Sequence, residues 1–333
     1  MRDLSISVYF VGAVLKHTVR RGINPISLLR QNRISPRLLQ ETDARISIER
    51  FADLQVSTML AMDDEALGYT LRPMPIGSWS MMCHAVINCE TLGQALARHC
   101  RFFQLFGLGV QPHLLVDDKT ASIRLIEADG EQSPPPYMSE LMLFNCHRFA
   151  SWLVQEHLAL QVVNLAYPAA AQPRDYRHMF RGNPMAFEQP HSELVIAKSM
   201  LEKPVLQTEQ SLRHYLRHPV LMMLTQDFAS NSWTTQVREK VRHNLVDMPE
   251  LKEVAQALDV HPQTLRRRLS AEGITFKEIK NQLRRDTALH LLGKQGVSIE
   301  EIAYRSGFSE SSAFIRAFKG WTGVTPYTYR KGL

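Results

Sequence analysis

An internal repeat in the last third of the chain constrains its fold more than any other feature. The stretch LKEVAQALDVHPQTLRRRLSAEGITF at 251–276 aligns with IEEIAYRSGFSESSAFIRAFKGWTGVTP at 299–326. Each copy holds an apolar–alanine pair, then a turn, then two large apolar residues four apart with an arginine midway between them. A duplicated segment of this kind is one supersecondary element used twice. The pattern predicts two helix–turn–helix units.

Each predicted unit marks its turn and the start of its second helix. Asp259 stands in the turn of the first copy and Gly307 in that of the second, where a tight bend is needed. His261 precedes Pro262, which is typical of an N-cap followed by proline in the first helical turn. In the second copy Ser309 is the predicted N-cap.

The residues between the two units predict a single linker helix. Thr275 and Glu278 have the spacing of a capping box, and Gly293 is a helix stop. A helix of roughly 18 residues is about 27 Å long. Such a spacer can set two recognition helices into successive major-groove segments, whose centres lie about 34 Å apart. The expected boundaries are about 249–272 and about 298–320 for the two units and 275–292 for the linker helix, within an all-α domain at 236–333.

The helical period predicts which side chains of the second helices point outward. If Leu265 and Leu269 face the core, Arg267 points away from it, and Arg316 holds the equivalent position in the second copy. The outward faces carry amides, hydroxyls and cations, which are the groups that read base edges and hold phosphates. Arg268 projects to the other side, where a neutral surface role and a phosphate contact both remain open. The predicted DNA contacts are His261, Gln263, Thr264, Arg266, Arg267, Ser270, Ser309, Ser311, Ser312, Ile315, Arg316, Lys319 and Thr325.

The net charge of +6 is concentrated in the repeat-containing third. Residues 236–333 hold 17 Lys and Arg against 11 Asp and Glu, so the rest of the chain is neutral. A neutral body with a basic module is typical of a protein that binds nucleic acid.

The first two thirds mix helix and strand signals and predict an α+β domain over 1–207, followed by a helical connector at 208–235. Thr91 and Gln94 form a capping box that opens a helix to about Phe106. The other expected elements are two strands within 114–127 around a turn at 117–119, a long helix at about 137–160, a strand at 162–167, a short helix at 173–180 and short strands at 186–188 and 194–196.

Two stretches of this sequence resemble a known family. Residues 236–333 resemble the DNA-binding domain of the AraC/XylS transcription regulators, carried by VAQALDVHPQTLRRRL, RRDTALHLL and IAYRSGFSESSAFIRAFKGWTGVTP. Residues of about 20–205 are similar to the arabinose-binding-type sensor domain of the branch that includes ornithine-utilisation regulators. This second likeness is carried by GINPISLLRQNRISPRLL, by the RLI and VVNLAY strands, and by FRGNPMAFEQPHSELVIAKSMLEKPV. Many relatives have Gly where Asp259 stands, which makes the first unit slightly less standard.

The resemblance implies a sequence-specific transcription regulator controlled by a small metabolite in the N-terminal domain. Its implied partners are double-stranded promoter DNA, an effector of unknown identity and, as a further candidate, RNA polymerase. We expect a homodimer that binds two direct or inverted sites. The sign of regulation depends on where the operator lies relative to the promoter.

Two rival functions belong to other classes. The chain could be a ligand-independent architectural DNA-binding protein, or an enzyme with a DNA-binding tail. The sequence contains no G-x-S-x-G, H-E-x-x-H, P-loop or G-x-G-x-x-G motif that would support an enzyme. We therefore expect no catalytic residues and no cofactor. Turnover of a ligand would support the enzyme, and a ligand-induced thermal shift would count against the architectural protein.

The effector site is the feature that the sequence specifies least. Arg98 and Arg101 are candidate carboxylate anchors beside Phe102, Phe103 and Phe106. The favoured interpretation is that these phenylalanines are core residues at helical spacing, with both arginines in water.

The cysteines and the hydropathy profile indicate location. None of the four cysteines, Cys83, Cys89, Cys100 and Cys146, forms a C-x-x-C motif. We expect reduced, buried thiols and no metal site, with a metal or thiol sensor as the alternative, because three of them adjoin a histidine. No apolar run reaches the roughly 18 residues of a membrane span, and no signal peptide is indicated. The expected location is the bacterial cytoplasm, on the nucleoid.

Overall fold

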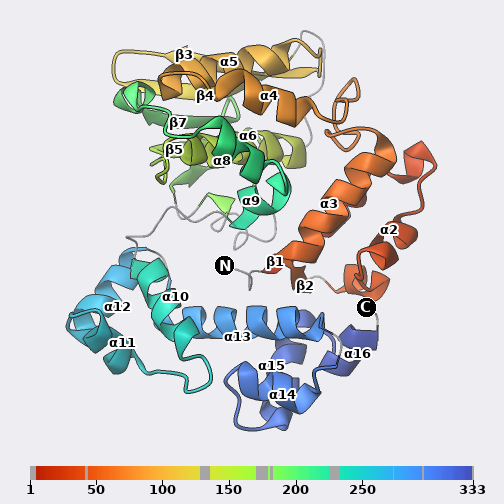
Figure 1. The fold of residues 1–333 in the computed structure, drawn as a ribbon, viewed down its shortest axis with the longest axis vertical. Coiled ribbons are helices and arrows are strands. Elements are labelled where there is room, and N and C mark those ends of the chain that lie inside the picture. The colour runs from red at the N-terminus through yellow and green to blue at the C-terminus, as the bar shows by residue number, and fades with distance from the viewer. Residues whose placement is uncertain are drawn as a thin grey trace. The chain divides into compact units, whose positions relative to one another are not determined.

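The computed structural model describes residues 5–41, 44–127, 136–169, 179–180, 183–225, 233–272, 274–294 and 296–331 (Figure 1). The chain divides into two compact units. The first, here called the helical unit, comprises Met1–Gly12, Pro25–Leu54 and Ala229–Leu333. The second, here called the sensor unit, comprises Ala13–Asn24 and Gln55–Phe228.

The sensor unit is built on a five-stranded sheet in the order β3-β4-β7-β5-β6. All neighbouring strands are antiparallel except the parallel pair β5–β6. The expected turn at 117–119 is confirmed, because the Asp117 carboxylate accepts hydrogen bonds from the backbone amides of Lys119 and Thr120. The strands are β3 (Val110–Val116), β4 (Thr120–Glu127), β5 (Val162–Asn164), β6 (Met185–Ala186) and β7 (Glu193–Ala197).

Helices pack around this sheet, and the most amphipathic of them contacts β3. This helix, α5 (Leu92–Gln104), begins where the Thr91 hydroxyl accepts from the Gln94 amide, as the capping pattern predicts. It ends two residues before the expected Phe106. The long helix α6 (Pro136–Leu153) ends seven residues before the expected 160, and the expected helix at 173–180 lies almost wholly outside the described residues. The other described helices that lie wholly within this unit are η1 (Val19–Arg21), α4 (Ser78–Val86), η3 (Lys198–Glu202), α8 (Glu209–Tyr215) and α9 (Pro219–Thr225).

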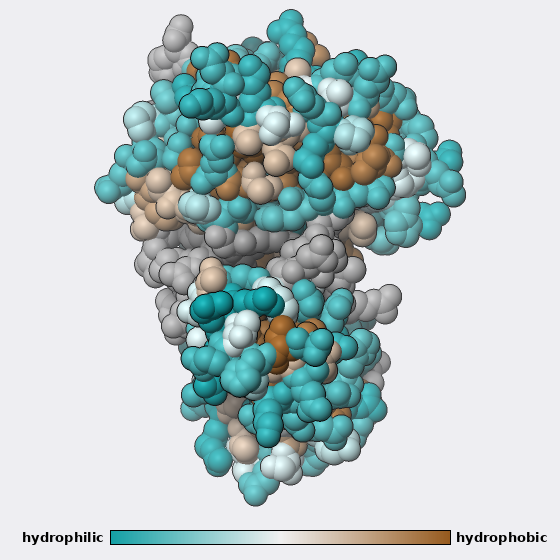
Figure 2. Space-filling view, turned by 90° about the vertical axis from the view of Figure 1, so that its left-hand side faces the viewer, coloured by the Kyte–Doolittle hydropathy of each residue, from teal (hydrophilic) through white to brown (hydrophobic). Residues whose placement is uncertain are grey.

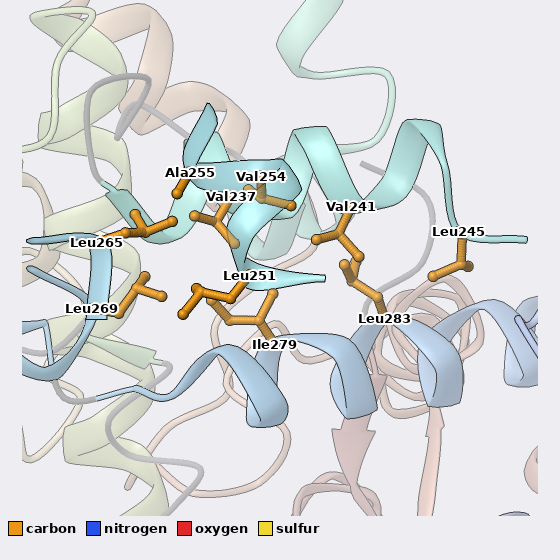
Figure 3. Close-up of a cluster of buried hydrophobic side chains, with 10 residues drawn as sticks. All are labelled: Val237, Val241, Leu245, Leu251, Val254, Ala255, Leu265, Leu269, Ile279 and Leu283. Carbon is orange, nitrogen blue, oxygen red and sulfur yellow. The ribbon is translucent and has the colours of Figure 1, made fainter. Parts of the chain in front are cut away.

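The carboxy-terminal part of the helical unit consists of helices, as the sequence predicts. Four of them enclose a core of ten buried apolar side chains (Figure 3). Leu265 and Leu269 of α12 belong to this core, together with Ile279 and Leu283 of α13. The helices are α10 (Trp233–His243), α11 (Leu251–Ala257), α12 (Pro262–Ala271), α13 (Phe276–Leu292), α14 (Ile299–Arg305), α15 (Ser311–Thr322) and α16 (Pro326–Lys331).

Residues from the start of the chain complete the helical unit. The expected division places all of residues 1–207 in the sensor domain. Strand β1 (Ser5–Ser7) pairs antiparallel with β2 (Arg45–Ser47), and β2 contacts α13. The Ser5 hydroxyl donates to the Asp286 carboxylate of α13 at 2.7 Å, and the Arg45 guanidinium donates to the Ser5 carbonyl at 2.8 Å. The other elements here are α2 (Pro25–Gln31), η2 (Pro36–Gln40), the first residues of α1 (Val8–Leu15) and the first of α3 (Ile48–Met62).

The predicted connector at 208–235 is divided between the two units. Helices α8 and α9 belong to the sensor unit, whereas α10 packs into the core of the helical unit through Val237 and Val241. No described helix is both long enough and apolar enough to cross a membrane. Figure 2 shows one face of the molecule, where polar side chains predominate and apolar ones form small patches.

Candidate nucleic-acid interface

Helix α12 presents the predicted outward face of the first unit. The His261 Nδ1 atom accepts a hydrogen bond from the Gln263 amide at 3.3 Å, so His261 is the N-cap that the sequence predicts. Leu265 and Leu269 are fully buried, and this burial fixes the rotation of the helix. The side chains of His261, Gln263, Arg266, Arg267 and Ser270 are therefore exposed, and that of Thr264 is half-buried.

Helix α15 presents the equivalent face in the second unit. Phe314 and Phe318 are fully buried, and Arg316 lies between them on the exposed side. The prediction of Ser309 as N-cap is wrong. The helix starts at Ser311, and its N-cap is Glu310, whose side chain forms no capping hydrogen bond. Ser309, Ser312, Arg316 and Lys319 are exposed, while Ser311, Ile315 and Thr325 are half-buried.

The two turns reach the same backbone conformation with different residues. Asp259 has φ 53° and Gly307 has φ 77°, both in the left-handed region. A Cβ atom at Gly307 would lie 2.5 Å from the Leu245 carbonyl oxygen, so the second turn requires glycine. Aspartate tolerates this conformation better than most residues, which explains how the first turn forms without glycine.

Three cations of the recognition faces have no carboxylate partner among the described residues, whereas some other cations of this unit do. Arg267, Arg316 and Lys319 form no ion pair with any residue that the structure describes. By contrast, Arg305 pairs with Glu301, and Lys280 pairs with Glu250. Unpaired, exposed cations on two equivalent helices leave their charge available to phosphates and base edges.

Two further arginines, Arg268 of α12 and Arg284 of α13, have partners within the fold that the sequence pattern does not predict. The Arg268 guanidinium lies 3.9 Å from the ring centroid of Trp233, a cation–π contact. Arg284 donates to the Gly307 carbonyl at 2.9 Å and stacks over Phe308, and burial lowers its pKa. Arg284 thus ties α13 to the turn of the second unit.

The Thr325 hydroxyl, one of the predicted contacts, has hydrogen-bond partners within the fold. Its oxygen lies 2.9 Å from the Thr328 hydroxyl and accepts from the Thr328 amide at 3.2 Å. These bonds cap α16, so the hydroxyl is already used in the fold.

The sensor unit contains a cavity of about 50 Å³. Apolar side chains from α5, β4 and α6 line most of it, among them Phe103, Ile123 and Met138. Its polar lining residues include Glu65, His99 and Asn145. Of the candidate effector residues, neither Arg98 nor Arg101 lines it. Both are exposed, and Arg98 donates to the Ala85 carbonyl at 2.8 Å.

The four cysteines are free and buried. Burial raises the pKa of each thiol, to about 12 for Cys100. Among the described residues, no group of three His, Cys, Asp or Glu side chains is placed to hold a metal ion. The thiols thus have the environment of buried structural cysteines.

Comparison with known proteins identifies both parts of the chain. Residues 22–205 match the family model described as the arabinose-binding domain of AraC transcription regulators, and residues 254–332 match a helix-turn-helix domain model. The ornithine utilization regulator of Pseudomonas aeruginosa is 28% identical over 327 residues, covering 98% of this chain and 96% of that protein. An uncharacterised helix-turn-helix transcriptional regulator of Mycobacterium tuberculosis is 26% identical, covering 97% of this chain and 96% of its own.

A shorter match lies in one part of the chain. The regulator VirS of Mycobacterium tuberculosis is 42% identical over 77 residues, which is 23% of each chain.

Proposed function

The chain belongs to the AraC family of transcription regulators, and from that premise we propose that it binds operator DNA through α12 and α15 together. The observation that carries this proposal is the equivalence of Arg267 and Arg316, each exposed between two buried apolar residues of its helix. Helix α13 spans 17 residues, or about 25 Å, and connects the two units. A connection of that length suits two successive major-groove segments.

The DNA-binding role that we propose for each residue follows from the exposure of its side chain. Arg267 and Arg316 donate to base edges, and Lys319 holds a phosphate. Gln263, Arg266, Ser270 and Ser312 lie on the same exposed faces and contribute further polar contacts. Arg268 acts mainly through its contact with Trp233 rather than through DNA.

The regulator acts, in this proposal, as a cytoplasmic homodimer on the nucleoid, with one effector site in each sensor unit and RNA polymerase as a candidate partner. The cavity lined by Glu65 and His99 is the proposed effector site. The curated relatives named above are transcription regulators, and the sequence holds none of the common catalytic motifs, which supports a protein without catalytic activity. Turnover of a bound small molecule by the purified chain would contradict that part of the proposal.

The test is selection of genome fragments by the purified full-length protein, followed by sequencing. The proposal predicts one enriched motif with two half-sites about ten base pairs apart. The genes beside that motif then nominate the effector. Uniform recovery of all fragments would show that the basic third binds only the phosphate backbone, without sequence preference. The architectural hypothesis would then replace the regulatory one.

A further inference from the structure

The cavity of the sensor unit combines an apolar wall with a single charged residue. Phe103, Ile123 and Leu125 contribute to the wall, and Glu65 contributes the charge. No lysine or arginine is among the lining residues. A bound molecule therefore meets carbon on most sides and a carboxyl group on one side.

The Glu65 carboxyl is held in position by the backbone of α4 and the residue before it. One oxygen accepts from the Gly77 amide at 2.7 Å and the other from the Trp79 amide at 2.8 Å. Glu65 forms no ion pair within the part of the chain that the structure describes. Burial raises its pKa, and no lysine or arginine lines the cavity to balance the charge of the ionised carboxylate.

His99 and Asn145 are further polar residues among those that line the same cavity. His99 is buried, and burial lowers its pKa to about 4, so its imidazole is neutral near pH 7. The Asn145 side chain forms no hydrogen bond with any other described residue, which leaves its amide free to donate and accept. Neither group supplies a positive charge at neutral pH.

Methionines make the apolar wall adjustable. Met74, Met138 and Met142 all line the cavity. Their unbranched side chains repack around different shapes more readily than branched ones do. A cavity of about 50 Å³ can thus enlarge around a short ligand by changes in methionine rotamers.

We propose that this cavity binds a small amine with a short apolar body, and that the Glu65 carboxylate is its counter-ion. The inference rests on the proposed function in taking the cavity as the effector site. The ammonium group completes an ion pair with Glu65, and the neutral groups of His99 and Asn145 accept further hydrogen bonds from it. The apolar body lies against Phe103 and the methionines.

An aliphatic carboxylate is the alternative that this chemistry disfavours. It would bring a second negative charge next to Glu65, with no cation on the cavity wall to balance either. An alcohol of the same length avoids the repulsion but gains no ion pair. Comparing the affinities of an amine, an alcohol and a carboxylate of one chain length therefore shows which charge the site prefers.

The test is isothermal titration calorimetry of the full-length protein at pH 7.5 with n-butylamine, n-butanol and butyrate. We expect the amine to bind about tenfold or more tightly than the alcohol, and butyrate to bind most weakly. Glu65→Gln should remove the preference for the amine. Glu202→Gln, which changes an exposed carboxylate of the same unit, should leave that preference unchanged.

Several outcomes would overturn the proposal: no detectable binding of the amine, tighter binding of butyrate, or an unchanged amine preference in Glu65→Gln. If that variant does not fold, the ranking of the three probes by the wild-type protein decides the question. Fragment selection with the same preparation separates this inference from the proposed function. A single enriched motif together with no amine binding would reject the amine site and leave the DNA-binding regulator standing.

Discussion

The Ser5 hydroxyl donates a hydrogen bond to the Asp286 carboxylate at 2.7 Å, joining residues that are 281 positions apart. Asp286 is only 3% exposed, and its carboxylate also accepts from Arg285 Nε at 3.2 Å. The start of the chain thus belongs to the helical unit. The strand that carries Ser5 is held by pairing with β2, whose Arg45 donates to Ser5 as well.

Replacing Ser5 by Ala should destabilise the helical unit by about 1–2 kcal/mol, because a buried carboxylate loses one of its donors. Urea unfolding of the full-length protein, followed by far-ultraviolet circular dichroism, measures this change. Ser199→Ala alters an exposed hydroxyl of the sensor unit and should leave the unfolding curve in place. Identical curves for both variants would show that the bond to Asp286 contributes nothing.

Gly307→Ala should destabilise the second helix–turn–helix unit by more than about 2 kcal/mol. The substitution adds a Cβ at a φ of 77° and places it 2.5 Å from the Leu245 carbonyl oxygen. Gly320→Ala is the matched control, because a Cβ there meets nothing within 4 Å on helix α15. The control should be neutral or stabilise by about 0.5–1 kcal/mol. Thermal unfolding of the three proteins compares them directly.

His99→Phe should reduce the loss of folding stability that the protein shows as the pH falls from 6.5 toward 4. The folded protein holds the His99 pKa at about 4, below the usual 6.5, because the ring is buried. The neutral ring is fully compatible with folding above pH 6.5, and this contribution is lost as the pH falls toward 4, where the folded protein also binds the proton. The loss amounts to about 3 kcal/mol across that window. Denaturant unfolding at several pH values should show that loss in the wild type only. Parallel profiles would contradict the prediction.

Lys319→Ala should weaken binding to all DNA sequences alike and reduce the slope of log Kd against log salt concentration by about one. An exposed lysine that neutralises one phosphate releases about one counterion on binding. Fluorescence anisotropy at several salt concentrations gives the slope. Lys119→Ala, at the tip of the β3–β4 turn, should keep the wild-type slope. A sequence-dependent loss in Lys319→Ala would instead indicate a base contact.

Periodicity allowed most of the DNA-binding region to be predicted. Leu265 and Leu269, with Phe314 and Phe318, fix which face of each helix is buried, so the exposure of Arg267 and Arg316 followed from spacing alone. The Ser309 cap was wrong by one residue, because Ser309 and the adjacent Glu310 both suit a helix start and the local pattern does not separate them.

Features that join distant segments could not be predicted in this way. No local pattern relates Ser5 to Asp286, because their contact depends on the pairing of β1 with β2 and on the placement of β2 against α13. The cavity is a similar case. Glu65 and His99 come from separate segments, and only the fold of the sensor unit brings them to one space.

The central claim is that Arg267 and Arg316 read sequence from two helices of one unit. Anisotropy with the selected operator and a scrambled fragment tests it, using the wild type, Arg267→Ala, Arg316→Ala and, as a control on α8, Arg213→Ala. We predict that each of the first two variants loses about 1–3 kcal/mol of operator affinity while scrambled-fragment affinity changes little, and that the control keeps both. Unchanged operator affinity in both recognition-helix variants would contradict the account.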